Sequence, residues 1–201
     1  MAMPFLARPL AALAAVLLLA PAAMAANTGE TTLGNPKAKV TVIEYASVTC
    51  PHCGRFNNDV LPAFKAKYVD TGKVFYIFRE FPTDPVQLSA AGFMVARCAP
   101  ADKYFAVLDA LFHGQEKLYQ SQDGKTFLLN AAKVGGMDEA KVQACIEDKA
   151  NQDAFNARIQ TAIDTAKIRA TPTFVIGKTK VEGEQTLADL SAVIDPLLAA
   201  K

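Results

Sequence analysis

The chain lacks an excess of charge of either sign, internal repeats, low-complexity tracts and, after its first 26 residues, any long apolar run. Its 21 basic and 20 acidic residues give a formal net charge of +1, so the sequence offers no basic surface for nucleic acid. The missing repeats exclude a repeat array, and no later segment is apolar over enough residues to span a bilayer. These absences leave one globular domain, or one domain with an insertion, of about 175 residues.

The amino-terminal segment is the exception to this balance. Arg8 is followed by an apolar stretch over residues 10–20 and by the small-residue sequence Ala23–Ala25. This order is typical of a cleaved secretory signal, whereas a membrane anchor would need a longer stretch than the one that Pro21 interrupts. We expect residues 1–26 to be a cleaved signal peptide and the mature chain to be periplasmic, where disulfides form and persist.

Two cysteines, Cys50 and Cys53, enclose Pro51 and His52 directly after the apolar, β-branched run over residues 40–45. Thiols at i and i+3 between a predicted strand and a predicted helix are typical of a thioredoxin-type redox pair. Cys50 would lie at the helix start, where unpaired backbone N–H groups and the helix dipole favour an anion. Here the anion is a thiolate, which is both the attacking and the leaving form in thiol–disulfide exchange.

The alternatives for this motif are a zinc half-site and a pair of structural cysteines. A zinc site with four cysteine ligands needs a second closely spaced pair, but Cys98 and Cys145 stand far apart in the sequence. His52 lies between the two thiols of the motif and cannot easily join them around one metal ion. We therefore expect a redox site without metal and without any cofactor other than the Cys50–Cys53 disulfide itself.

The hydrophobic pattern around the motif predicts a βαβ unit. Residues 40–45 form a buried strand, residues 74–78 form a second strand, and a helix between them ends at Gly72. Pro62 is expected to kink this helix. Its apolar side chains recur at helical spacing, at Phe56, Val60, Phe64 and Tyr68. The dithiol would then follow the carboxyl end of the first strand, where sites in open α/β sheets tend to lie.

The pattern changes to consecutive helices over residues 87–167, with no convincing strand among them. A strand at 173–176, a turn at Gly177, a short strand around Val181 and a final helix follow. The order βαβ, helical block, ββα is an α/β thioredoxin fold with an inserted helical subdomain. The expected divisions are a signal peptide over 1–26, a thioredoxin domain in two parts over 27–86 and 168–201, and the inserted subdomain over 87–167.

Thr171 and Pro172 open the third predicted strand. Proline at a strand start is either an edge feature or a turn, and its peptide bond can be cis at modest cost, so local sequence leaves both conformations open. With this dipeptide in place, the chain resembles the DsbA-like thiol:disulfide oxidoreductases. The resemblance rests on Cys-Pro-His-Cys at 50–53, the helical block and Thr-Pro-Thr-Phe at 171–174, and it covers nearly the whole mature chain.

The resemblance implies roles for the motif residues. Cys50 would form the mixed disulfide with a reduced client protein, and Cys53 would be the buried partner that closes or resolves it. Pro172 would be a cis-proline facing the dithiol, which leaves the backbone of Thr171 to pair with an extended client segment. A membrane-bound, DsbB-like quinone-linked oxidase would reoxidise the dithiol.

Two further residues have a physical argument for a role in proton and charge control. Glu44, six residues before Cys50, matches the buried acid of this family and could relay a proton to the buried thiol; the alternative is an ordinary solvated strand residue. His52 could donate a hydrogen bond or place a positive charge beside the Cys50 thiolate, which would lower the pKa of Cys50.

Cys98 and Cys145 each lie on an apolar helical face, so they could be two buried free thiols. In an exported protein with an even number of cysteines, a structural disulfide between two helices is the favoured interpretation. Closing a loop of this length would stabilise the fold by about 4 kcal/mol in the chain-entropy model.

The leading functional hypothesis is an exported oxidase that donates its Cys50–Cys53 disulfide to reduced clients. Two departures from the family keep a disulfide isomerase or reductase open: Thr171 precedes the proline, as in isomerases and some oxidases, and the chain has no tryptophan. The few residues expected between the cleavage site and the first strand favour the oxidase. Two hypotheses from different classes are a non-catalytic, chaperone-like client binder and a metal carrier that uses Cys50, His52 and Cys53.

Overall fold

A five-stranded sheet forms the centre of the protein, which is represented by a computed structural model that describes residues 1 and 29–200. Apart from Met1, the predicted signal peptide lies outside the described residues. The strands occur in the order β1-β3-β2-β4-β5. Their bounds are β1 (Thr31–Leu33), β2 (Val40–Ala46), β3 (Val74–Glu80), β4 (Thr173–Ile176) and β5 (Thr179–Glu182).

The central strand β2 pairs in parallel with β3 and antiparallel with β4, and β1 and β5 form the antiparallel edges. Most of β2 is buried, as expected for a central strand covered on both faces. The dithiol loop leaves its carboxyl end. The short strand β1 was not predicted, because three residues are too few to show a period of two.

One continuous helical run follows the dithiol over residues 51–69, but its geometry alternates. Regular turns of α1 (Pro51–Arg55) and α2 (Leu61–Phe64) alternate with the π-helical segments η1 (Phe56–Val60) and η2 (Lys65–Val69). Pro62, at the start of α2, cannot donate the usual backbone hydrogen bond, so the predicted irregularity lies next to η1. The chain then turns at Gly72, whose φ of 72° suits glycine.

Helices alone connect β3 to β4 among the described residues, as the sequence pattern predicts. They are α3 (Val86–Cys98), the 3₁₀ turn η3 (Ala101–Lys103), α4 (Tyr104–His113), α5 (Gln115–Ser121), α6 (Gly124–Val134), α7 (Glu139–Glu147) and α8 (Lys149–Asp164). The final helix, α9 (Leu187–Ala199), begins with a capping box between Thr186 and Asp189. The element order therefore agrees with the predicted thioredoxin fold that contains a helical block.

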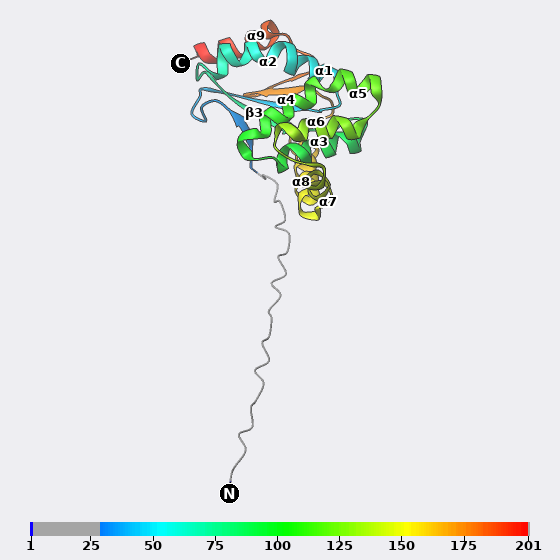
Figure 1. The fold of residues 1–201 in the computed structure, drawn as a ribbon. Coiled ribbons are helices and arrows are strands. Elements are labelled where there is room, and N and C mark those ends of the chain that lie inside the picture. Colours follow the sequence, from blue (N-terminus) through cyan, green and yellow to red (C-terminus); the bar gives the residue numbers. More distant parts are fainter. Residues whose placement is uncertain (2–28, 201) are drawn as a thin grey trace.

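The helices lie on both sides of the sheet. In Figure 1, α1, α2 and α9 cover one side, whereas α7 and α8 lie furthest from α9 at the opposite end of the molecule. The larger of two buried hydrophobic clusters joins the sheet to the helical block, since Phe78 of β3 contacts Phe93 of α3 and Phe112 of α4. The helical block is thus packed firmly against the strands that carry the dithiol. None of the helices within residues 29–200 has the length and apolar character needed to cross a bilayer.

Candidate redox site

Cys50 and Cys53 lie at the first turn of α1, as two buried thiols that are not bonded to each other. Cys50 is the N-cap residue and has an extended backbone, and Pro51 occupies the first helical position, where its missing N–H costs nothing. The next N–H groups along the helix therefore point back toward the Cys50 sulfur. The local sequence itself places the first thiol where a negative charge is favoured.

The surroundings of Cys50 stabilise its thiolate. Its pKa falls from 9.0 to about 5, chiefly because the Cys53 thiol donates a hydrogen bond to it, and burial opposes this effect. The Thr171 side chain and the backbone N–H groups of Cys53 and His52 lower the pKa further. Cys50 is thus the thiol of the pair that ionises first.

Cys53 has the opposite character. Its side chain is fully buried, and its pKa lies well above the usual value, first because of burial and then because it donates to Cys50. The backbone N–H of Ser47 points at its sulfur over 3.5 Å. Near neutral pH the reduced pair therefore carries one thiol proton, and this proton is bound to the Cys53 sulfur.

Glu44 lies on β2, and only 2% of its surface is exposed, so it is not a solvated strand residue. Within residues 29–200, the only hydrogen bond to its carboxyl group comes from the Tyr76 hydroxyl of β3. Burial raises the pKa of Glu44 to about 8, against the lowering effect of Tyr76, and the negative charge of Cys50 raises it further. A carboxyl group with this pKa can both hold and release a proton near neutral pH.

His52 is placed differently from the sequence-based prediction. Its ring is 56% exposed, and Nδ1 lies 2.8 Å from a carboxylate oxygen of Glu184 and 2.6 Å from Arg55. Arg55 also donates two hydrogen bonds to Glu184, at 2.9 and 2.7 Å. The contribution of His52 to the pKa of Cys50 comes from its backbone N–H. Its ring instead belongs to an exposed ion-pair cluster beside α1.

Pro172 and Thr171 approach the dithiol from the other part of the thioredoxin fold. The Thr171–Pro172 peptide bond is cis, and the Cys50 thiol donates to the Thr171 carbonyl oxygen over 3.5 Å. The Thr171 hydroxyl is buried and has no hydrogen-bond partner among the described residues while Cys50 is a neutral thiol. An ionised sulfur would attract this proton, which accounts for the lowering effect of the side chain on the pKa of Cys50.

The helical block also holds the dithiol loop. Gln115 of α5 is buried and donates to the carbonyl oxygens of Val48 (2.9 Å) and Cys50 (3.1 Å). Tyr119, one turn further along α5, donates to the Thr49 carbonyl over 2.7 Å. The backbone that presents Cys50 is therefore fixed by two side chains that the sequence analysis did not identify.

The close approach of α5 explains a glycine in the dithiol helix. A Cβ atom at Gly54 would lie 2.1 Å from the Gln115 side-chain oxygen, so even alanine would force the amide away from the loop. A Gly directly after Cys-x-x-Cys was visible in the sequence. The packing of Gln115 against this glycine, from about sixty residues away, was not visible in the sequence.

Cys98 and Cys145 are joined by a disulfide between α3 and α7. Both residues are buried, and the Asn151 side-chain amide lies beside them, with its nitrogen 3.4 Å from the Cys98 sulfur. Among the described residues, no three His, Cys, Asp or Glu side chains are grouped so that they could hold a metal ion.

Comparisons with known proteins agree with the fold described above. A family model described as Thioredoxin matches residues 26–196. The structure of Wolbachia pipientis alpha-DsbA1 superposes with a TM-score of 0.76 at 34% identity, over 85% of this chain and 91% of that one. A Rickettsia bellii protein, provisionally named a protein-disulfide oxidoreductase, is 29% identical over 81% of this chain. The chain spans 62% of that protein's length. Disulfide bond formation protein D of Bacillus subtilis is 22% identical over 86% of this chain and 79% of its own.

Proposed function

Because the chain belongs to the DsbA-like family of the thioredoxin superfamily, we propose that it is an exported oxidase that donates the Cys50–Cys53 disulfide to reduced client proteins. The observation that carries this proposal is the convergence of hydrogen-bond donors on the Cys50 sulfur. These donors favour the ionised, reduced form of the pair. A disulfide whose reduced form is stabilised is a strong oxidant.

The exchange takes place in two steps. A client thiolate attacks Cys50, the Cys50–Cys53 bond breaks, and the electron pair of that bond leaves on the Cys53 sulfur. A second client thiolate then attacks the client sulfur of the mixed disulfide and releases Cys50 as a thiolate. The client loses two electrons and gains a disulfide, while the protein is left with a Cys50 thiolate and a Cys53 thiol.

The environments of the two sulfurs suit these steps. Cys53 leaves as a buried anion and needs a proton, which Glu44 can supply, since the pKa of Glu44 is about 8 and its charge is felt at Cys53. Cys50 leaves in the second step, and its low pKa makes it a good leaving group. In this mechanism Glu44 is a proton donor to Cys53.

The same site would bind the client protein and would afterwards be reoxidised. An extended client segment would pair with the backbone of Thr171, next to the cis peptide bond and the Cys50 sulfur. The name of the Bacillus subtilis relative supports a role in disulfide formation. A DsbB-like, quinone-linked membrane oxidase would return the dithiol to the disulfide. We place the protein in the periplasm, on the basis of its predicted signal peptide.

The test is a redox equilibrium between the purified protein and glutathione buffers, followed by separation of the alkylated and disulfide forms. An oxidase requires a couple more oxidising than glutathione, near the values of known disulfide donors, about −120 mV. A reduction potential near that of thioredoxin, about −270 mV, would contradict the oxidase and favour a reductase.

Reactivation of scrambled ribonuclease in the same buffers separates isomerase from oxidase activity. Loss of all activity on Cys50→Ser excludes a chaperone-like binder.

A further inference from the structure

A cavity of about 290 Å³ lies away from the dithiol, between the carboxyl end of β3 and helix α8. It is lined on the sheet side by Tyr45 of β2, whose neighbour Glu44 belongs to the redox site. Since successive strand residues face opposite sides of a sheet, the cavity and Glu44 occupy opposite faces of β2. The charged lining residues are Glu30, Arg79, Glu80, Arg97 and Arg158.

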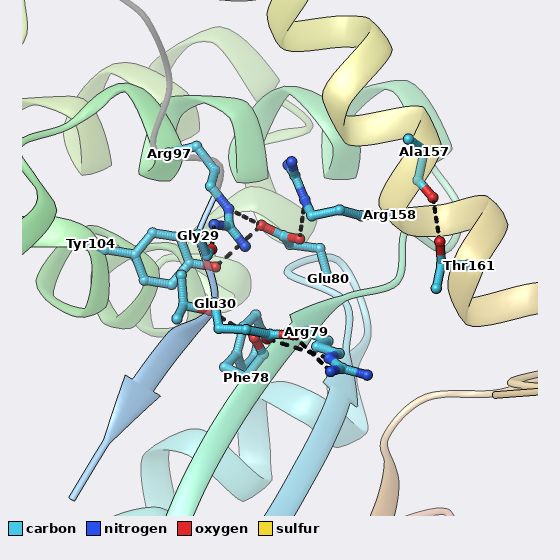
Figure 2. Close-up of polar contacts among 11 residues, drawn as sticks. Gly29, Glu30, Phe78, Arg79, Glu80, Arg97, Tyr104, Ala157, Arg158 and Thr161 are labelled. Carbon is cyan, nitrogen blue, oxygen red and sulfur yellow. Dashed lines mark hydrogen bonds and ion pairs between the residues drawn. The ribbon is translucent and has the colours of Figure 1, made fainter. Parts of the chain in front are cut away.

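The lining carries an excess of positive charge. The lining contains three arginines and two carboxylates. Figure 2 shows that Arg97 and Arg158 are both directed at Glu80, whereas Arg79 is paired with Glu30. Glu80 is buried and accepts from Nε of Arg97 and, over 3.0 Å, from Nε of Arg158. Both carboxylate oxygens of Glu30 accept from Arg79. The acceptors of the cavity are therefore already engaged.

Donors remain on two of the lining side chains. The Arg158 side chain makes one hydrogen bond within residues 29–200, through Nε, and its guanidinium carbon lies 5.9 Å from the centre of the Phe155 ring, so neither Nη group has a hydrogen-bond partner in that part of the chain. The Tyr45 hydroxyl accepts from Arg79 over 2.8 Å, and its own proton has no acceptor in the same part of the chain. Arg158 is 25% exposed and Tyr45 is buried, so these donors lie at the mouth and in the wall of the cavity.

A purely structural role would be to join α8 to β3 through Glu80. That role accounts for the hydrogen bonds from Nε of Arg97 and Nε of Arg158 to Glu80. It does not require the third arginine of the lining, or the donors of Arg158 and Tyr45 that have no acceptor among the described residues. Two guanidinium nitrogens in one plane match the two oxygens of a carboxylate or phosphate. The cavity is at the lower end of the usual range for ligand pockets, which limits the ligand to a small molecule.

We propose that this cavity binds a small anion with a carboxylate or phosphate group, held by the Nη groups of Arg158 and by the Tyr45 hydroxyl. The site is separate from thiol–disulfide exchange, and the proposal does not depend on the function proposed above. The bound anion would neutralise the excess charge of the arginines and tie α8 to β2.

The experiment is isothermal titration calorimetry of the purified protein with inorganic phosphate and, separately, with succinate, at low ionic strength. We expect saturable binding of one or both at a single site, with an affinity that falls as sodium chloride is added. Phosphate alone, or succinate alone, would identify which oxyanion the site takes. No saturable heat from either would overturn the proposal.

Variants distinguish the cavity from general charge attraction. Arg158→Gln should weaken binding by about tenfold or more, because a charge-assisted hydrogen bond is lost. Arg169→Gln makes the same chemical and charge change at an exposed residue outside the cavity and should leave the affinity unchanged. Equal weakening by both variants would overturn the site.

Tyr45→Phe provides a second test that changes no charge. It removes the hydroxyl and should weaken binding by less than Arg158→Gln does, while thermal unfolding and glutathione equilibrium report whether the fold and the dithiol are intact. Unchanged affinity in folded Tyr45→Phe would overturn the role of the hydroxyl, and unchanged affinity in folded Arg158→Gln would overturn the site.

Discussion

The two cysteine pairs of this protein have the same chemistry and opposite surroundings. Cys50 is at a helix start beside backbone N–H groups, a second thiol and a threonine hydroxyl, all of which favour a negative sulfur. Cys98 and Cys145 lie between α3 and α7 in the apolar core. The spacing in the sequence already separates the two pairs, and the donors that reach the Cys50 sulfur supply the physical reason, because exchange requires a thiolate.

The two pairs also differ in what holds them. The dithiol loop is bound by Gln115 and Tyr119 of α5, whose hydrogen bonds go to its carbonyl oxygens and not to its sulfurs. The Cys98–Cys145 disulfide needs no such support, since it is itself the link between its helices. We therefore expect the first pair to determine activity and the second to determine stability.

The largest effect should come from Cys50→Ser. Without the attacking and leaving sulfur, oxidation of reduced ribonuclease by the protein should be lost completely. The double variant Cys98→Ala/Cys145→Ala is the matched control and should retain most of that activity. Activity lost equally in both proteins would remove the distinction between a catalytic and a structural pair.

The same double variant should be less stable. Loss of the cross-link over a sequence separation of 47 residues lowers the free energy of unfolding by about 4 kcal/mol in the chain-entropy model. Urea denaturation of the oxidised parent and the variant measures this difference. Alkylation under mild reduction should label Cys50 before Cys98 or Cys145, and simultaneous labelling of all the cysteines would count against separate roles.

Glu44 should make the protein less stable as the pH rises. Its pKa is raised from 4.5 to about 8 by burial, so folding opposes its ionisation, and stability falls as the pH rises from 4.5 through 8. The cost at pH 7 is on the order of 3 kcal/mol, and Glu44→Gln should remove it. The difference in unfolding free energy between this variant and the parent should therefore grow from pH 5 to pH 8.

Glu184→Gln is the control for that pH profile. The Glu184 carboxylate is exposed, and Arg55 first and His52 second hold its pKa at about 2. A carboxylate with a lowered pKa contributes stability above pH 4.5 and loses it as the pH falls toward 2, which is the opposite sign. A constant difference between Glu44→Gln and the parent across pH 5 to 8 would contradict the buried acid.

The smallest of these effects should come from Thr171→Val. Removal of the hydroxyl withdraws one donor from the Cys50 thiolate, so the pKa of Cys50 should rise and the disulfide should become less oxidising. A change of about tenfold in the glutathione equilibrium constant corresponds to one charge-assisted hydrogen bond of about 1.4 kcal/mol. Thr173→Val, whose hydroxyl donates to the Ala170 carbonyl, should leave that constant unchanged.

Much of the fold could be predicted from the sequence, because β2, β3 and the long helices are periodic over many residues. Strand β4 was placed at its observed bounds, since Pro172 and Gly177 delimit it. Strand β1 was missed because only three residues carry it. The π-helical turns on either side of α2 have no hydrophobic signature, so sequence indicates only an irregularity near Pro62.

The site was predicted where local sequence carries it and missed where tertiary packing does. The motif itself indicates a thiol at a helix start. The contacts of Gln115 depend on the packing of α5, and an uncharged amide in a helix gives no signal of its own. The His52 ring was assigned to the thiolate because they are close in sequence, but the structure places its Nδ1 beside Glu184 and Arg55, and Glu184 is distant in the sequence.

The most direct test of the account is the titration of Cys50 in the reduced protein, followed by thiolate ultraviolet absorbance and by the rate of iodoacetamide labelling. A stabilised thiolate should titrate at a pKa of about 5, and the signal should disappear in Cys50→Ser. A Cys50 thiol that keeps its proton up to its ordinary pKa of 9.0 would contradict the central claim that the donors around this sulfur make the pair an oxidant.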